Sequence, residues 1–595
     1  MTDAAAQVES AKKALAEAEA ALAAERAAAM VEPVAIPGEV PAPANPTEPS
    51  SVGAGVAESL RDSPSSSAQL TPEQVDIIRA GYAFDAPALE MGVLVNGDPL
   101  VDVPIRIPIA MVNRHGLVAG ATGTGKTKTL QVLAEQLSAA GVPVFAADIK
   151  GDLSGIASPG EPNEKLLERT ASIGQHWLPA ASPTEYFTLG GLGIGVPIRA
   201  TVSSFGPLLL SKVLGLNPTQ ESCLGLVFFY ADQSGLPLVG LDDLRAVLQW
   251  LTSDEGKPEL KSIGGISAVT FANEGADVFF GEPEIDTALF LRTTAGGKGI
   301  VSLLEIPDVQ DKPALFSTFL MWLLADLFND LPEVGDIDKP KLVFFFDEAH
   351  LLFKDASKDF IASITQTVRL IRSKGVGIVF VTQTPKDVPS DVLAQIGSRV
   401  QHQLRAHTPD DAKALKSTVS TYPTSGYDLG EVLTGLATGE AIITVMNEKG
   451  APSPVAWTRL RAPQGSMAPT PAAEMQATVL ASPLTAQYGT VIDRESAHEI
   501  LAVKMNAAAD AAARVDAEKA AAAQEKDAAR IQADYDKAVR DMQRASAPKR
   551  PTSSTTTRTS RSSQGNPIED VLGSRTGQTV VREVLRGIFS TLKRK

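Results

Sequence analysis

The run Gly120-Ala121-Thr122-Gly123-Thr124-Gly125-Lys126-Thr127 decides how the rest of this 595-residue sequence is interpreted. It matches the pattern G-x-x-x-x-G-K-[ST], it follows an apolar strand candidate at 116–119, and it precedes a helical pattern at 129–140. Gly123 and Gly125 allow the backbone to wrap closely around a phosphate with its N–H groups pointing inward. The alternative, an ordinary glycine-rich turn before a helix, is disfavoured because the strand and the helix are both present.

All eight residues of this run form the candidate nucleotide-binding site. Lys126 can reach the β- and γ-phosphates of ATP, and Thr127 can hold Mg²⁺. The N-terminus of the following helix adds positive potential beside the phosphates. The sequence therefore predicts ATP and Mg²⁺ as ligands.

A second run, LVFFFDEAH at 342–350, supplies two adjacent carboxylates at the end of an apolar strand. Three consecutive phenylalanines indicate a strand that is buried on both faces, as in the centre of a parallel sheet. Asp347 matches the carboxylate that binds Mg²⁺ through water, and Glu348 is the candidate general base for the attacking water. The alternative is that both acids merely end the strand and cap the next helix. Together with the phosphate loop, the pair predicts hydrolysis of the nucleotide.

A third apolar run, GIVFVTQT at 377–384, ends in a glutamine. Because ligands in such sheets lie outside the carboxyl ends of the strands, Gln383 is a candidate contact to the γ-phosphate or to the lytic water. The alternative is a hydrogen bond between Gln383 and backbone at the strand end.

Four arginines near this strand are candidates for neutralising the charge of the transferred phosphate, in cis or from a neighbouring subunit. They are Arg369, Arg372, Arg399 and Arg405. We select Arg399, although a solvated or salt-bridged side chain is the simpler interpretation of each arginine taken alone. A weaker pattern, DIKGD at 148–152, either binds water linked to Mg²⁺ or a nucleic-acid backbone, or is a plain exit from a strand into a loop.

The alternation of strand and helix patterns from 111 to 461 predicts an α/β fold with a mostly parallel central sheet. The distance between Asp148 and Asp347 predicts a mostly helical insertion at about 155–300, and 441–446 with 455–460 predicts a closing hairpin. The remaining expected segments are an Ala-rich helical arm (1–30), a Pro/Ser-rich linker (31–70), a short helix and β lead-in (71–110), a linker (462–495), an Ala-rich charged helix or coiled coil (496–545), a disordered basic linker (546–565) and an amphipathic helix (566–595).

Charge and composition restrict the classes of partner. The net charge is −16, which predicts long-range repulsion of nucleic acid except at a local basic patch. The tail from Ser546 onward carries an excess of Lys and Arg, so it either binds DNA or RNA electrostatically or is a flexible solvated tail. Cys223 is the single cysteine of the sequence, so an internal disulfide is excluded and a reducing cytoplasm fits best. The longest apolar run is too short for a bilayer, so we expect no membrane insertion.

Several segments together resemble the HerA-like helicase group, and more narrowly its bacterial branch with the HerA-like C-terminal domain. These segments are 120–127, 142–155, 339–353 and 368–383, and the resemblance resumes from Ser574. It implies a RecA-like P-loop ATPase of the HerA/FtsK superfamily, whose members usually act as hexameric rings that pump duplex DNA. HerA itself carries an N-terminal β-barrel, and residues 71–110 are too short to form one fully.

Carried over by residue, the resemblance makes Lys126 and Thr127 the Walker A pair and Asp347 and Glu348 the Walker B pair. Gln383 becomes the sensor and Arg399 the arginine that acts on the neighbouring subunit. The expected function is a DNA translocase or helicase that assembles as a homo-oligomer, which the resemblance implies to be a hexamer. A nuclease partner has no support in the sequence. Two alternatives stay open: a secretion- or conjugation-type ATPase, and a nucleotide-gated scaffold that translocates nothing.

Overall fold

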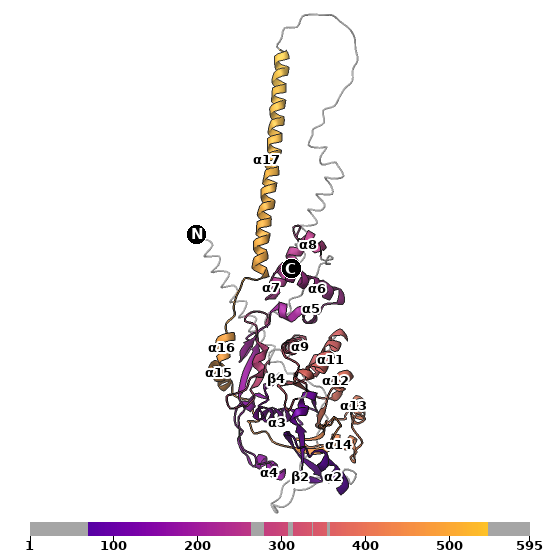
Figure 1. Ribbon diagram of the computed structural model, residues 1–595. Helices are drawn as coiled ribbons and strands as arrows, with labels where there is room; N and C mark the ends of the chain where they lie inside the picture. Colours follow the sequence, from indigo (N-terminus) through magenta and orange to yellow (C-terminus); the bar gives the residue numbers. More distant parts are fainter. Residues whose placement is uncertain (1–68, 263–278, 307–312, 336, 354–357, 546–595) are drawn as a thin grey trace, which may run out of the picture. The chain divides into compact units, whose positions relative to one another are not determined.

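One mixed sheet organises the part of the chain that the structure describes (Figure 1). The structure is a computed structural model that describes residues 69–262, 279–306, 313–335, 337–353 and 358–545. Contacts divide the chain into residues 1–63 and 64–595, and every described residue lies in the second unit. The expectations for 1–30, for 31–68 and for 546–595 therefore lie outside the described residues.

The strands of the described residues are β1 (Ala88–Asn96), β2 (Asp98–Pro108), β3 (Gly116–Ala119), β4 (Val144–Asp148), β5 (Thr184–Leu189), β6 (Val196–Ile198), β7 (Val301–Glu305), β8 (Leu342–Phe346), β9 (Val376–Thr382), β10 (Ser398–Gln401), β11 (Glu440–Val445) and β12 (Ala456–Leu460). Their order in the sheet is β2-β1-β12-β11-β10-β3-β9-β8-β4-β7-β5-β6. The strands from β10 to β6 run parallel, and those from β2 to β10 pair antiparallel. The predicted α/β class with a mostly parallel central sheet is confirmed.

The α-helices are α2 (Pro72–Gly81), α3 (Lys126–Ala139), α4 (Glu164–Ser172), α5 (Val202–Val213), α6 (Pro218–Gln233), α7 (Leu241–Thr252), α8 (Lys257–Ser262), α9 (Pro313–Asp330), α10 (His350–Phe353), α11 (Lys358–Ile371), α12 (Ser390–Leu393), α13 (Pro409–Val419), α14 (Leu429–Gly435), α15 (Ala472–Ala481), α16 (Pro483–Tyr488) and α17 (Ala497–Ala545). Short 3₁₀ segments are η2 (Ile109–Arg114), η3 (Ser154–Ala157), η5 (Thr287–Leu291), η7 (Arg372–Lys374) and η8 (Pro385–Asp387). Within the described residues, no helix combines the length and the apolar character that crossing a bilayer requires.

The central parallel strands are buried on both faces. Every residue of β8 and of β9 is buried, which explains why both strands read as continuous apolar runs rather than as alternating patterns. Phe344 packs on Phe145 of β4 with 5.0 Å between ring centroids, and Phe346 stacks on Phe380 of β9 at 5.9 Å. These contacts hold β4, β8 and β9 in register, and their carboxyl ends meet at the edge where the candidate site lies.

The described part of the chain between β4 and β8 carries several helices, and it also contributes strands to the sheet. β5, β6 and β7 extend the parallel sheet beyond β4. All three are short, and β7 is buried along its whole length. A short strand without alternation cannot be told from a helix fragment by its periodicity, so the sequence pattern did not reveal them.

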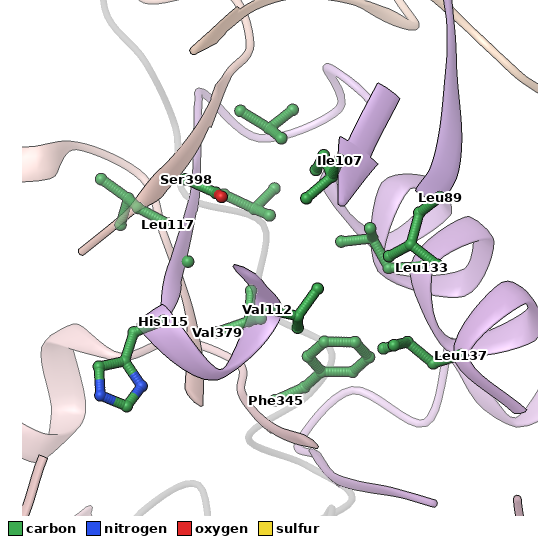
Figure 2. A pocket seen from close by; sticks show the side chains of 13 residues that line it. Leu89, Ile107, Val112, His115, Leu117, Leu133, Leu137, Phe345, Val379 and Ser398 are labelled. Carbon is green, nitrogen blue, oxygen red and sulfur yellow. The ribbon is translucent and has the colours of Figure 1, made fainter. Parts of the chain in front are cut away.

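The N-terminal lead-in forms a hairpin of β1 and β2 that joins the main sheet through β12. Behind it lies a small apolar cavity of about 30 Å³, and Figure 2 shows Leu89, Ile107 and Leu133 lining it. His115 stands at the edge of this cavity. Its Nδ1 accepts a hydrogen bond from the backbone N–H of Ile378 (3.1 Å), so its Nε2 donates to the carbonyl of Val368 (2.8 Å).

The prediction of a loose linker at 462–495 is wrong. The segment forms α15 and α16, and its beginning is bound to the core: the Glu135 carboxylate accepts hydrogen bonds from the backbone N–H groups of Gln464 and Gly465, each 2.8 Å long. Leu484 and Tyr488 are buried. The many Pro, Ala and Thr residues of the segment concealed these few anchoring side chains, because composition does not show which positions are buried.

α17 occupies the segment that the sequence predicts as an Ala-rich charged helix (Figure 1). The buried Asp243 carboxylate anchors its beginning, because it accepts hydrogen bonds from the Ser496 hydroxyl (2.5 Å) and from the backbone N–H of His498 (2.8 Å). Farther along, Ile531 and Tyr535 are 70% and 65% exposed. The coiled-coil seam at these residues stays a prediction.

Candidate functional site

The phosphate loop connects β3 to α3. Gly123 and Gly125 have φ angles of +83° and +110°, which L-residues with a side chain rarely adopt. Gly125 directly precedes the first helical residue, Lys126, so the loop leads into the positive end of the α3 dipole. The two glycines are therefore required by the backbone path that makes the loop a concave anion site.

The Lys126 side chain folds back over the loop. Its ammonium donates hydrogen bonds to the carbonyl oxygens of Gly120 (2.8 Å) and Ala121 (3.2 Å). Burial lowers the pKa of Lys126, although the charges of Glu348 and Asp347 oppose the shift. A buried ammonium whose hydrogen bonds go to two neutral carbonyls is well suited to bind an anion, since a phosphate oxygen offers it a charged partner.

Buried groups support the loop from below. The backbone N–H of Gly120 donates to the carbonyl of Thr382 (3.2 Å), and that of Ala121 donates to the carbonyl of Gln403 (2.9 Å). The imidazole Nε2 of His402 lies 2.9 Å from the hydroxyl oxygen of Thr129 in α3. Burial lowers the pKa of His402 to about 4, so the ring is neutral at neutral pH and adds no charge beneath the loop.

The carboxylate pair follows β8 directly. The backbone N–H of Glu348 donates to Asp347 Oδ1 (2.9 Å), and Glu348 has a φ of +47°. A positive φ in a residue with a side chain costs about 1–3 kcal/mol and is found mainly at functional sites. Burial, together with the neighbouring charge of Glu348, raises the pKa of Asp347 to about 6. Two adjacent acids, one half-buried and one buried, are stabilised in their charged form by cations, which is the chemistry of a magnesium-nucleotide site.

The loop after β4 brings a third group of polar side chains to the same edge. The Thr127 hydroxyl donates to Asp152 Oδ2 (3.2 Å), and Lys150 forms an ion pair with Glu348. Asp148 fixes the loop, because its two oxygens accept hydrogen bonds from the backbone N–H groups of Gly151 and Leu153, each 2.8 Å long. Lys150 and Asp152 contact candidate site residues, although the sequence pattern gave them little weight. The signal was present in the polar DIKGD run at the strand end, but it did not separate a site from a plain loop.

Glu305 ends β7 next to Asp148 in the sheet register. Burial, with the nearby charges of Asp148 and Asp152, raises the pKa of Glu305 to about 8. The shift favours the neutral form of this carboxyl group, which limits the negative charge at this edge.

The other candidate residues lie at different distances from the loop. Gln383 directly follows β9, the strand between β3 and β8, and its side chain is exposed. Arg399 lies opposite Leu117 in the register of β10 and β3, three residues before the loop, and its Nη1 donates to the Thr421 hydroxyl (2.9 Å). The structure therefore gathers Lys126, Thr127 and the Walker B acids at one edge and leaves Arg399 away from the phosphate loop of its own chain.

Another of the four arginines touches the loop. The Arg405 guanidinium donates through Nη2 to the carbonyl of Thr122 (3.2 Å). The sequence did not single out Arg405, because spacing along the chain does not show which of the four side chains contacts the loop.

The residues at this edge fit a magnesium ion that is shared with a nucleotide. Among the described residues, no group of three or more His, Cys, Asp or Glu side chains forms a metal cage by itself. Mg²⁺ usually keeps waters and takes one or two protein ligands plus phosphate oxygens, so a cage is not required. The Thr127 hydroxyl supplies an oxygen ligand, and Asp152 Oδ1 is buried without a hydrogen-bond partner in the described part of the chain.

Comparison with known proteins gives one family and several relatives. Residues 95–595 match the family model described as Helicase HerA-like C-terminal. A probable helicase, MJECL08, of Methanocaldococcus jannaschii is 30% identical over 358 residues, which are 56% of this chain and 64% of that protein. The DNA double-strand break repair helicase HerA of Sulfolobus acidocaldarius is 23% identical over 368 residues, which are 60% of this chain and 67% of that protein. The chain thus spans about two thirds of the length of these curated relatives.

Solved structures with a similar arrangement include the bacterial conjugative coupling protein TrwB in its unbound form, with 16% identity, coverage of 68% of this chain and 95% of that chain, and a TM-score of 0.45. VirB4 of Thermoanaerobacter pseudethanolicus has 13% identity, coverage of 64% and 98%, and a TM-score of 0.40.

Proposed function

Because the chain belongs to the helicase HerA-like C-terminal family, we propose that it is an ATP-hydrolysing motor that moves duplex DNA. One observation carries this proposal: the phosphate loop with Lys126 and Thr127, and the carboxylate pair Asp347 and Glu348, end strands that are separated only by β9. An ammonium, a hydroxyl and two acids at one sheet edge are the groups that phosphoryl transfer to water requires.

In the proposed reaction, water attacks the γ-phosphorus of ATP in line with the leaving oxygen. An O–P bond forms, the bond to ADP breaks, and the Glu348 carboxylate accepts the proton of the water. The loop N–H groups and Lys126 bind the phosphates and neutralise their charge. Thr127 and Asp347, with Asp152 beside them, would hold Mg²⁺, which supplies further neutralisation of phosphate charge when bound.

The role proposed for Gln383 requires a bound nucleotide, and the role proposed for Arg399 requires a neighbouring subunit. Gln383 is exposed at the end of β9, between the two strands that carry the loop and the acids, so it is suited to sense the γ-phosphate. Arg399 does not contact the loop of its own chain, and we propose that it serves the site of a neighbouring subunit in a homo-oligomeric ring, a hexamer by family resemblance. The single cysteine, Cys223, supports a cytoplasmic location.

Mixing of inactive variants tests the role of Arg399. Arg399→Ala chains are mixed with Lys126→Ala chains, and ATP hydrolysis is measured at several ratios. Recovered activity is expected, because one interface in a mixed ring combines an intact loop with an intact arginine. Inactivity at every ratio contradicts the assignment.

The proposed function is tested by ATP hydrolysis with and without duplex DNA at two salt concentrations, together with size-exclusion mass analysis. We expect a several-fold stimulation by DNA that weakens as salt rises, because phosphate contacts release counterions. A rate of ATP hydrolysis that changes neither with DNA nor with salt would favour a secretion- or conjugation-type ATPase or a nucleotide-gated scaffold. Failure of the full chain to bind magnesium nucleotide would exclude all three.

A further inference from the structure

The ion pair between Lys150 and Glu348 joins an exposed cation to the buried candidate base. The two residues are 198 positions apart, and they come from the loops after β4 and β8. The Lys150 side chain is 45% exposed, whereas that of Glu348 is 10% exposed. The carboxylate is therefore held from the solvent side by a group that other anions can reach.

The ion pair holds one oxygen of the Glu348 carboxylate, whereas the other oxygen is buried without a hydrogen-bond partner in the described part of the chain. One oxygen, Oε1, pairs with Lys150, and the other, Oε2, lies 3.3 Å from Nδ1 of His350. The backbone N–H of Glu348 is bonded to Asp347, and its φ of +47° fixes where the side chain starts. A carboxylate with an ammonium on one oxygen is not free to orient a water with that oxygen.

The loop that carries Lys150 also reaches the phosphate loop. Asp148 fixes its backbone, and Asp152 accepts a hydrogen bond from the Thr127 hydroxyl. The same short loop thus contacts a phosphate-loop residue and the candidate base. The charge of Lys150 also acts on Lys126, which indicates that its ammonium lies within electrostatic reach of the phosphate site.

We propose that Lys150 is a positioning residue for Glu348: its ammonium holds the carboxylate in a resting position and releases it when a phosphate group competes for the ammonium. The inference rests on the proposed function, since it requires Glu348 to act on water. The competing phosphate belongs either to the bound nucleotide or to the backbone of DNA, and both present the same anionic oxygens.

A purely structural ion pair is the rival explanation. A partly exposed pair of this kind adds little to stability. Loss of Lys150 should then leave hydrolysis unchanged or lower it by the same factor in every condition. The positioning role instead predicts a change that depends on which phosphate is present.

The experiment compares full-length wild type with Lys150→Ala and Lys150→Arg, and it measures kcat and KM for ATP with and without duplex DNA. Lys298→Ala is the matched control, because Lys298 is an exposed lysine in the turn before β7, at the opposite, amino-terminal edge of the parallel strands. Thermal unfolding of each variant shows that the chain is folded.

If DNA is the competitor, Lys150→Ala should raise kcat without DNA by about two- to fivefold, the strength of a partly exposed ion pair, and stimulation by DNA should fall toward one. If the nucleotide is the competitor, KM for ATP should rise with kcat maintained and stimulation unchanged. In both cases Lys150→Arg should behave like wild type. Wild-type kinetics in Lys150→Ala, or an equal loss of kcat with and without DNA, overturns the inference. A wild-type chain that does not hydrolyse ATP refutes the proposed function instead.

Discussion

The phosphate loop and the acidic edge of the site are built in opposite ways. The loop is continuous, since residues 120–127 carry the glycines, the ammonium and the hydroxyl in one run. The acidic edge is assembled from the ends of β4, β7 and β8, which lie far apart in the sequence. A continuous site is specified by local backbone geometry, whereas an assembled site depends on strand order and register. Mutations in the two regions should therefore fail in different ways.

The strongest test of the continuous region is Lys126→Ala. Among the described residues, this ammonium is the one buried cation bonded to the loop carbonyls of Gly120 and Ala121. Its loss removes the positive charge that stabilises both the bound nucleotide and the transition state. We expect hydrolysis to fall by about 1,000-fold or more. Steady-state ATPase assays and calorimetric titration with magnesium nucleotide measure both effects. Nucleotide affinity that stays at the wild-type level would show that the loop does not bind phosphate through this residue.

The matching test of the assembled region is Glu348→Gln. The amide has nearly the same shape but cannot accept a proton, so ATP should still bind while turnover falls by about 100- to 1,000-fold. Binding and single-turnover hydrolysis are measured on the same preparation. If Glu348→Gln hydrolyses ATP at the wild-type rate, the general-base assignment is wrong. The division between a loop that binds the nucleotide and an acidic edge that hydrolyses it would then not hold.

Asp152→Asn tests the link between the two regions, because Asp152 accepts the hydrogen bond from the Thr127 hydroxyl. Loss of one negative charge beside a magnesium ligand should weaken Mg²⁺ binding. The Mg²⁺ concentration needed for half-maximal activity should therefore rise by about tenfold, and activity should fall by a similar factor. The assay is ATP hydrolysis over a range of Mg²⁺ concentrations. Asp232→Asn is a suitable control, since Asp232 is an exposed acid on α6 in the helical insertion. Equal behaviour of the two variants would remove Asp152 from the site.

The same contrast explains how much the sequence could reveal. The loop residues and the Walker B acids were readable because each lies directly after an apolar strand, and the central strands that carry them were located correctly. Lys150 and Asp152 were underrated because their meaning comes from neighbours that only strand pairing supplies. The strands β5, β6 and β7 were missed because short buried strands lack alternation, and 462–495 was misread because composition hides which side chains pack.

The smallest effect is expected at His115, a buried residue before β3 that takes part in neither region. Its ring joins the start of β3 to β9 and to the end of α11 through Ile378 and Val368. Burial lowers its pKa to about 4 from an ordinary value of 6.5, so the folded state binds this proton less readily than the unfolded state does. The stabilisation is full above pH 6.5 and is lost as pH falls toward 4, by roughly 2 kcal/mol between pH 7.5 and pH 5.

Urea unfolding at both pH values, for wild type and His115→Gln, isolates this contribution, because the other titrating groups are common to both chains. The variant should be less stable at pH 7.5 and should lose less stability on acidification. An identical pH dependence in the two chains would mean that the ring is already protonated, or already exposed, in the folded protein.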